Sequence, residues 1–355
     1  MILQFQKMHG SSNDIIMVTT PWQQLMEHFG VSGSLDPTAP SNFAQTLVLR
    51  LCDRDGDFGA DGVYFLDIDE HGHVDANFYN PDGSFAGMCG NGLRAVTRLV
   101  NDHLAEKPDQ VVITSDGSPF VGSDTDLFVG IEEATISTRS ISFATQDLPM
   151  NVNSPEFVES KIEASGTSLA FTALAIPNNH LVAMVDEFDL DQLKYVGEKL
   201  TIPNELIPNG ANVSFVVELP DVDGRKEFFV RTFERGAGLT ASCGSGQTAS
   251  RAVLTKAGII SGLEPVLLRN VGGPAYVELK ESDDRYFGLL TGNANYVYTA
   301  EVELLPDGTF NSVSGPDTNK DEIDQFKDLF EDNKKLIEKA GIEADFESAE
   351  KAFHV

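Results

Sequence analysis

The sequence predicts an α+β protein built from two similar domains that meet at a cleft. One observation is a repeated cysteine turn, found as Met88-Cys89-Gly90-Asn91-Gly92 and again as Ser242-Cys243-Gly244-Ser245-Gly246. Each copy runs into a helix-like stretch, at 93–99 and at 247–254. A second observation is that short apolar runs separated by turn residues, typical of strands, fill the rest of both halves. From these observations we expect the same order of strands in both halves, with one conspicuous helix in each half.

In the first half, strands are expected at 2–7 and 15–18, then a helix at 43–52 and a hairpin with strands at 62–67 and 74–79. Residues 20–42 are rich in proline, glycine and serine and predict a surface insertion. We therefore place an N-terminal domain at 1–135, completed by a strand near 290–304.

The second half repeats this order, with strands at 136–143, 169–175, 212–218 and 227–233 before the second cysteine turn. Closing strands are expected at 276–280, 287–291 and 296–304, which gives a C-terminal domain at 136–289. Residues 305–316 read as a linker because proline, glycine and serine recur there. The apolar residues of 317–340 fall near one helical face, which predicts an amphipathic helix packed on the body or on a partner subunit.

Composition excludes several classes of function. The formal net charge is −30, from 55 acidic and 25 basic residues, which argues against nucleic acid and anionic membrane surfaces as partners. No apolar run is long enough to cross a bilayer, and residues 1–10 lack the pattern of a signal peptide. Three cysteines without framework spacing fit a reducing compartment, so a cytoplasmic protein is expected.

The two cysteine turns indicate thiol chemistry. A cysteine at a helix N-terminus faces exposed backbone N–H groups, which favour the thiolate and also suit a substrate carboxylate. Two such thiols facing one substrate from opposite sides could remove a proton from one face of a carbon and return it to the other. Cys52, inside an apolar run, is interpreted as a buried core residue.

Other kinds of site find no support in the motifs. The cysteines lack partners at metal-ligand spacing, His71 and His73 sit in an expected exposed hairpin turn, and neither a nucleophile elbow nor a phosphate-binding glycine loop occurs. No cofactor and no metal are therefore expected. Polar turns containing Asn13, Asn80, Asn178 and the pair Glu234-Arg235 accompany the cysteine turns; each alone is ordinary turn chemistry.

Together these turns resemble the diaminopimelate epimerase family, the cofactor-independent two-cysteine epimerases and racemases. The resemblance covers residues 1 to about 304 and is carried by four segments. They are Met8-His-Gly-Ser-Ser-Asn13-Asp, the run from Asn80-Pro-Asp-Gly-Ser through Cys89 to Arg94, Glu234-Arg235-Gly-Ala-Gly-Leu-Thr-Ala-Ser-Cys243-Gly-Ser-Gly, and Leu290-Thr-Gly292-Asn-Ala294. Proline racemases share the plan but have histidine where Asn91 stands, and phenazine-type isomerases lack the thiol pair.

The resemblance implies a fold in which each domain wraps a β-sheet around a central helix, with the active site in the cleft. It implies that Cys89 and Cys243 are the acid and base for interconversion of LL- and meso-diaminopimelate. Residues implied to hold the reacting amino-acid centre are Asn13, Gly90, Asn91, Glu234, Gly244 and Ser245; those implied to hold the distal head are Asn80, Asn178, Asn212 and Arg235. The partners expected are a small amino-acid substrate and a second copy of the chain.

Several positions depart from the family pattern and keep alternatives open. The departures are Ser12 in place of glycine, Asp57 within the loop 54–62, Pro177 and Asn179 flanking Asn178, Leu239 in place of an acidic residue, and Asn293 in place of proline. A racemase of another amino acid, such as histidine, is the first alternative. The others are a redox protein with a regulatory Cys89–Cys243 disulfide and a non-catalytic amino-acid binding protein.

Overall fold

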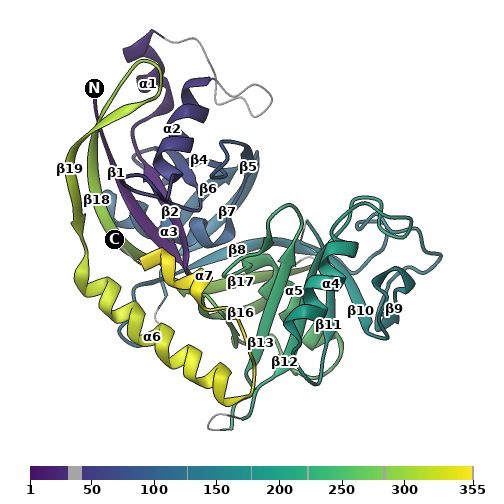
Figure 1. The fold of residues 1–355 in the computed structure, drawn as a ribbon. Helices are drawn as coiled ribbons and strands as arrows, with labels where there is room; N and C mark the ends of the chain where they lie inside the picture. The colour runs from purple at the N-terminus through teal and green to yellow at the C-terminus, as the bar shows by residue number, and fades with distance from the viewer. Residues whose placement is uncertain (31–41, 126, 177, 222–223, 283–284, 354–355) are drawn as a thin grey trace. The chain divides into compact units, whose positions relative to one another are not determined.

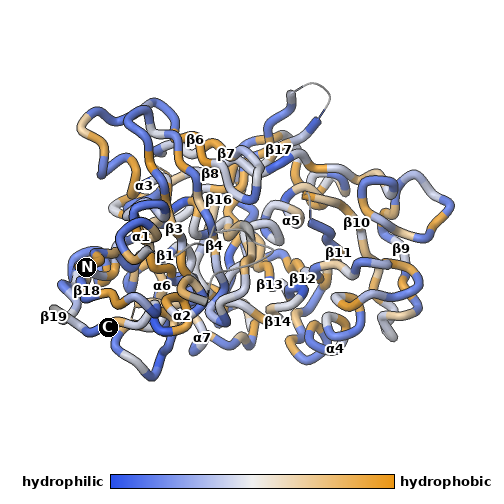
Figure 2. The backbone as a smooth tube through the Cα atoms, turned by 90° about the horizontal axis from the view of Figure 1, so that it is seen from above, coloured by the Kyte–Doolittle hydropathy of each residue, from blue (hydrophilic) through white to orange (hydrophobic). Residues whose placement is uncertain are grey.

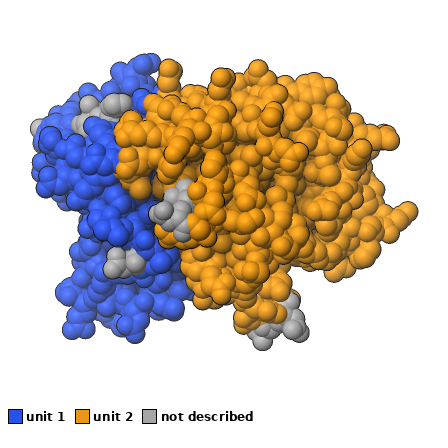
Figure 3. Space-filling view, turned by 90° about the horizontal axis from the view of Figure 1, so that it is seen from below, with its two compact units in different colours: residues 1–136, 292–328, 350–355 blue, residues 137–291, 329–349 orange. Residues whose placement is uncertain are grey.

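The structure is a computed structural model that describes residues 1–355 except 31–41, 126, 177, 222–223, 283–284 and 354–355. The chain divides into two compact units, coloured separately in Figure 3. Unit 1 consists of residues 1–136, 292–328 and 350–355, and unit 2 of residues 137–291 and 329–349. Among the helices in these described ranges, none has both the length and the apolar character needed to cross a membrane.

Unit 1 contains a mixed β-sheet whose strands follow the order β19-β18-β1-β2-β3-β4-β6-β7-β8, with β5 paired to β4 (Figure 1). Only the first residues of β8 belong to unit 1, because unit 2 begins at residue 137. The strand bounds are β1 Ile2–Gly10, β2 Asn13–Val18, β3 Val63–Ile68, β4 His73–Tyr79, β5 Phe85–Gly87, β6 Val111–Ser115, β7 Ser118–Ser123, β8 Glu133–Ile141, β18 Asn295–Leu304 and β19 Phe310–Thr318. Its helices are α1 Trp22–Phe29, α2 Asn42–Cys52 and α3 Gly90–His103.

Unit 2 contains the strands β9 to β17 and pairs them in the order β9-β10-β11-β12-β13-β15-β16-β17, with β14 on β13. Their bounds are β9 Ser160–Lys161, β10 Ala170–Ile176, β11 Asn178–Met184, β12 Asn212–Glu218, β13 Phe228–Glu234, β14 Gly238–Leu239, β15 Val266–Asn270, β16 Gly273–Ser282 and β17 Arg285–Asn293. The helices are α4 Leu190–Leu200, α5 Gly244–Lys256 and the short 3-10 helix Glu163–Ser165.

The two units repeat one pattern of strand pairing, which confirms the predicted two-domain α+β architecture. From β1 to β7 the successive pairs are antiparallel, parallel, antiparallel, parallel and antiparallel. The pairs from β10 to β16 follow the same sequence. Figure 2 shows hydrophobic and hydrophilic stretches along the chain of both units, and strands such as β10 and β12 are buried on both faces over most of their length.

A helix lies at the centre of each unit, as the resemblance implied. Helix α3 contacts β1, β2, β6 and β7, and α5 contacts β10 to β13, β15 and β16. Both helices are buried over most of their length on every face, which is typical of a core helix. The second glycine of each cysteine turn permits this packing: a Cβ on Gly92 would lie 2.6 Å from Ile15 Cδ1, and one on Gly246 would lie 2.3 Å from Thr232 Oγ1.

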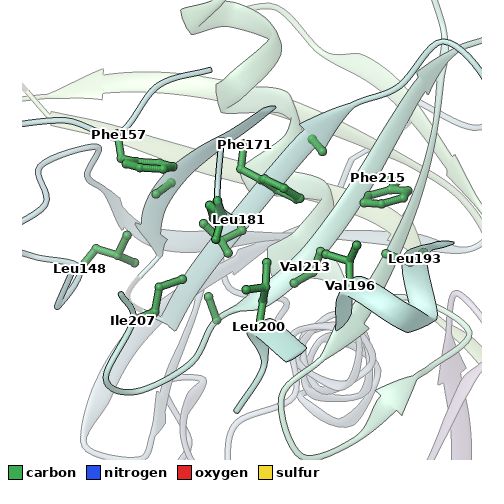
Figure 4. Packing of buried hydrophobic residues seen from close by; sticks show 14 of the residues in the cluster. Leu148, Phe157, Phe171, Leu181, Leu193, Val196, Leu200, Ile207, Val213 and Phe215 are labelled. Carbon is green, nitrogen blue, oxygen red and sulfur yellow. The ribbon is translucent and has the colours of Figure 1, made fainter. Parts of the chain in front are cut away.

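On the other face of the unit 2 sheet lies an apolar core, which helix α4 covers (Figure 4). Phe171, Leu181 and Phe215 of β10, β11 and β12 lie in one buried cluster with Leu193 and Val196 of α4. Burial of aromatic and aliphatic side chains is the main favourable term in folding such a layer. The core fixes β11 and β12, whose opposite face carries polar residues next to α5.

The C-terminal segment contains the expected helix, but most of the expected linker is a strand. Residues 310–318 form strand β19, which pairs with β18, and the helix α6 spans Lys320–Lys339. Serine, glycine and proline have weak strand propensity, so the strand depends on its pairing and on the burial of Phe310 against Phe58. After α6 come a short helix α7, Glu347–Glu350, and a 3-10 turn, Lys351–Phe353. Within the expected insertion 20–42, residues 22–29 form α1, whereas 31–41 lie outside the described residues.

Candidate active site

Cys89 is the N-cap residue of α3, as the cysteine-turn pattern predicts. Its backbone N–H donates to Tyr64 Oη at 2.9 Å, and the Tyr64 hydroxyl donates to the Cys89 carbonyl oxygen at 3.3 Å. Its Sγ lies 3.2 Å from Asn13 Oδ1, where the thiol donates a hydrogen bond. Strand β3 and the start of β2 therefore fix both the backbone and the thiol of Cys89.

Arg94, fully buried on α3, holds the first turn of the helix against the β1–β2 connection. It donates to Asn91 Oδ1 at 3.0 Å and to Ser11 Oγ at 2.9 Å. Asn293, which stands where the family has proline, accepts from the Ser11 N–H at 2.7 Å. The departure at Asn293 thus adds a hydrogen bond to the turn that precedes Asn13.

Ser12 departs from the family's glycine at a position where the backbone conformation favours glycine. Ser11 and Ser12 form the turn between β1 and β2, with φ of 51° and 57°. Both residues lie in the left-handed region, where glycine is favoured and other residues are strained. The family's usual glycine at position 12 is explained by this conformation.

Asn80, also predicted to bind substrate, lies in the connection from β4 to β5. Its Nδ2 donates to Ser84 Oγ at 3.0 Å, within its own turn. Unit 1 therefore holds five of the predicted site residues: Asn13, Asn80, Cys89, Gly90 and Asn91.

Cys243 is the N-cap residue of α5, and its Sγ accepts from the Gly246 N–H at 3.4 Å. A helix N-terminus favours the thiolate, but burial and the charge of Glu234 raise the pKa of Cys243 well above that of an ordinary thiol. The Glu234 carboxylate also accepts the thiol hydrogen bond, which favours the protonated form. Desolvation and the nearby carboxylate thus outweigh the helix N-terminus.

Glu234 is held by a short chain of polar groups. Its Oε1 accepts from Thr240 Oγ1, and the Thr240 carbonyl oxygen accepts from Arg231 Nη1. Burial raises the pKa of Glu234 and lowers that of Arg231 to about 10, while the charges of Asp345 and Glu234 favour the charged Arg231. Of these two carboxylates, Asp345 of the C-terminal segment stabilises the charged arginine more strongly.

Of the predicted distal-head residues of unit 2, Asn178 contacts the start of α5, and Asn212 contacts Arg235. Asn178 Nδ2 donates to Ser245 Oγ at 3.3 Å, and Asn212 Oδ1 accepts from the Arg235 N–H at 2.8 Å. Arg235 itself is exposed, with Nη1 donating to the Asn209 carbonyl oxygen. Unit 2 therefore holds the other seven predicted residues: Asn178, Asn212, Glu234, Arg235, Cys243, Gly244 and Ser245.

Of the two departures beside Asn178, the structure describes only Asn179. Asn179 alternates to the opposite face of β11 and donates to the Gly210 carbonyl oxygen at 3.2 Å. It therefore does not share the face of Asn178. Pro177 lies outside the described residues.

The sequence analysis did not assign roles to Tyr64, Arg94, Thr240 or Arg231. Arg94 is three residues after Asn91 on one helix, a spacing that places both on one face and could have indicated the contact. Tyr64 is distant in sequence from Cys89 and carries no such signal. Cys52 is buried as predicted, and burial with the charge of Asp14 raises its pKa to about 12. In the described ranges, no group of three or more His, Cys, Asp or Glu residues could hold a metal ion.

Comparison with solved structures supports the fold. A phenazine biosynthesis protein of the PhzF family from Bacillus anthracis aligns with a TM-score of 0.57 at 13% identity, covering 86% of this chain and 100% of that one. A probable proline racemase from Agrobacterium radiobacter aligns with a TM-score of 0.54 at 14% identity, covering 86% of this chain and 94% of that one. At these identities the likeness concerns the fold alone.

Comparison of sequences identifies the family. The family model described as diaminopimelate epimerase matches residues 5–121 and 171–297. A diaminopimelate epimerase of Enterococcus faecalis is 31% identical over 334 residues, 90% of this chain and 96% of the relative. One from Listeria innocua is 31% identical over 342 residues, 94% of this chain and 98% of the relative. The chain belongs to the diaminopimelate epimerase family and is an isomerase.

Proposed function

We propose that this protein interconverts LL- and meso-diaminopimelate by a two-base exchange between Cys89 and Cys243, without a cofactor. The observation that carries the proposal is that two equivalent units each place a cysteine at the N-cap of a buried central helix. The names of the sequence relatives, which match nearly the full chain, support diaminopimelate as the substrate.

The reaction begins with one cysteine as thiolate and the other as thiol. The thiolate takes the α-proton, and the thiol gives its proton to the opposite face of the same carbon, so the two cysteines end with exchanged protonation states. The reverse reaction uses them in exchanged roles. Each thiol has an acceptor for its S–H, Asn13 Oδ1 for Cys89 and the Glu234 carboxylate for Cys243, which stabilises the protonated partner.

Negative charge that develops during proton removal spreads into the α-carboxylate. Backbone N–H groups at a helix N-terminus point outward along the helix axis, so those at the starts of α3 and α5 can stabilise that charge. In this proposal Asn13, Gly90 and Asn91 from unit 1 hold the reacting centre together with Glu234, Gly244 and Ser245 from unit 2. Fixed dipoles of this kind need no reorganisation as the charge develops.

The distal amino-acid head is assigned to Asn80, Asn178, Asn212 and Arg235. Three amides and one guanidinium offer hydrogen bonds and a positive charge to a second carboxylate. A small amino acid is the proposed ligand, a second copy of the chain the proposed protein partner, and a cytoplasmic role in lysine and cell-wall precursor synthesis the proposed setting.

The substrate is tested by comparing kcat/KM for LL-diaminopimelate with that for L-histidine, L-lysine and L-alanine. We expect diaminopimelate to be preferred by orders of magnitude, because polar groups built for a distal head stay unpaired with the other substrates. Arg235→Ala is expected to cost about 2 kcal/mol or more of transition-state binding for diaminopimelate. Arg225→Ala, which removes another exposed arginine of unit 2, is the control and should have little effect. Faster turnover of histidine than of diaminopimelate contradicts the assignment.

A further inference from the structure

Asp61, which the proposed mechanism does not use, lies one hydrogen bond away from the residue that contacts Cys89. Its Oδ2 accepts from Asn13 Nδ2 at 3.4 Å, and Asn13 Oδ1 in turn lies 3.2 Å from Cys89 Sγ. The backbones of the two segments are also joined, since the Asp61 N–H donates to the Asp14 carbonyl oxygen at 2.8 Å. Asp61, Asn13 and Cys89 therefore form a continuous chain within unit 1.

A group of charges holds the Asp61 carboxylate in place. Arg54 Nη2 bridges Asp61 Oδ1 and Asp14 Oδ1 at 2.6 Å each. Lys7, fully buried on β1, pairs with Asp14 at 2.7 Å and gives that carboxylate a second cation. Asp14 thus has both cations, whereas Asp61 shares only one. Among the described neighbours, Cys52 of α2 is the remaining titratable group that feels the charge of Asp61, and its raised pKa keeps it a thiol.

The carboxylate determines which way the Asn13 amide points. An ionised carboxylate can only accept hydrogen bonds, so the NH2 group of Asn13 must face Asp61. The carbonyl oxygen of Asn13 must then face Cys89, where it can accept from the thiol but cannot donate to a thiolate. We propose that Asp61 is a positioning residue that fixes the Asn13 amide and thereby stabilises the thiol form of Cys89.

In the described part of unit 2, the equivalent asparagine is not oriented by a carboxylate. Asn178, at the start of β11, is the structural equivalent of Asn13 at the start of β2. Its Nδ2 donates to Ser245 Oγ, and its Oδ1 is buried with no hydrogen-bond partner in the described structure. Control of Cys89 through an oriented amide is therefore specific to unit 1, and Cys243 is controlled directly by Glu234.

The arrangement makes Cys89 sensitive to pH near neutrality. Burial and the charge of Asp14 raise the pKa of Asp61 to about 7, although 39% of its side chain remains open to solvent for proton exchange. Above that pH the ionised carboxylate holds the Asn13 amide in the orientation that stabilises the Cys89 thiol. Below it the carboxyl is protonated and no longer fixes the amide. The influence of Asp61 must therefore grow as the pH rises.

The test measures alkylation of Cys89 by iodoacetamide between about pH 5.5 and 8.5, a range that brackets neutrality. Peptide mass spectrometry follows Cys89, with Cys243 in the same sample as internal reference. In Asp61→Asn, we expect Cys89 to react at the wild-type rate at the acid end of this range. At the alkaline end we expect it to react roughly three- to tenfold faster than in the wild type, because the loss of one hydrogen bond to the thiol changes the thiol–thiolate equilibrium by about that factor. Asp55→Asn, an exposed change in the same loop, should match the wild type throughout.

Asn13→Ala removes the amide itself and should accelerate Cys89 in the same pH-dependent way, which keeps the test decisive if Asp61→Asn does not fold. In the Asn13→Ala background, Asp61→Asn should change the alkylation rate of Cys89 little further, because the amide that connects Asp61 to Cys89 is already absent. A rate ratio that stays flat with pH, or no acceleration in Asn13→Ala, overturns the proposal. The inference rests on the proposed role of Cys89, but the alkylation experiment needs no substrate. If the expected alkylation pattern is found and the protein does not turn over diaminopimelate, only the proposed function fails.

Discussion

At the scale of single residues, polar neighbours contact both thiols, and at Cys243 they outweigh the helix end. The helix N-terminus that the sequence predicts is present at Cys243, yet its pKa is raised because burial and Glu234 dominate. Such a thiol serves as a proton donor until a substrate changes its surroundings. Epimerisation needs one protonated partner in each direction, so a stabilised thiol is consistent with the proposed chemistry.

Ser12 provides a residue-scale prediction about stability. Its φ of 57° strains a side chain that has a Cβ, and glycine removes that strain. We expect Ser12→Gly to raise the free energy of unfolding by about 0.5–1 kcal/mol. Urea denaturation followed by circular dichroism measures the change, with Ser123→Gly in β7 as a control that should be destabilising, because glycine weakens a strand. A loss of stability in Ser12→Gly would show that the hydroxyl contributes more than the strain costs.

At the scale of secondary-structure elements, α6 is tied to the central helix of unit 1. Arg98 of α3 makes two hydrogen bonds to Glu322, at 2.6 and 2.8 Å, and the Tyr296 N–H donates to the same carboxylate at 2.8 Å. Nearby, the ring of Phe326 packs on that of the buried His9, with centroids 4.3 Å apart. The C-terminal segment therefore contacts β1 and α3; α3 is capped by Cys89, and β1 precedes the turn that leads to Asn13.

We expect Glu322→Ala to lower the free energy of unfolding by about 2–3 kcal/mol, because a largely buried carboxylate bonded to a cation and a backbone N–H is lost. Glu331→Ala, on the exposed face of the same helix, changes the helix propensity as much as Glu322→Ala does. It should leave the free energy of unfolding nearly unchanged. Chemical denaturation of both variants measures the difference. Equal effects would mean that α6 is held by its apolar contacts alone.

Other elements show where sequence reasoning succeeds and where it stops. The start of α3 and α5 at the cysteines and the β3–β4 hairpin follow from local signals, which need no partner to be recognised. Strand β19 could not be predicted, since its residues favour turns and only pairing with β18 makes them a strand. The contacts of Asp61 and Tyr64 depend on strands brought together by the sheet, and no spacing in the chain encodes them.

At the scale of the whole molecule, one architecture is used twice with different chemistry. The repeated strand pairing gives each unit a buried helix capped by cysteine, but Asn13 with Asp61 serves one thiol and Glu234 serves the other. A two-base reaction needs two proton-exchanging groups, but their pKa values need not be set by the same neighbours. The duplication gives each unit one such group, a cysteine at the N-cap of its central helix.

The central claim is that both thiols take part in proton exchange at one carbon. It is tested most directly by incubating the wild type, Cys89→Ala and Cys243→Ala with LL-diaminopimelate in D2O and following both the optical rotation and deuterium at the α-carbon. We predict that the wild type forms meso-diaminopimelate with incorporated deuterium and that each variant loses epimerisation, because a single base cannot deliver a proton to the opposite face. Substantial epimerisation in either single variant, with the protein folded, would contradict the two-thiol account.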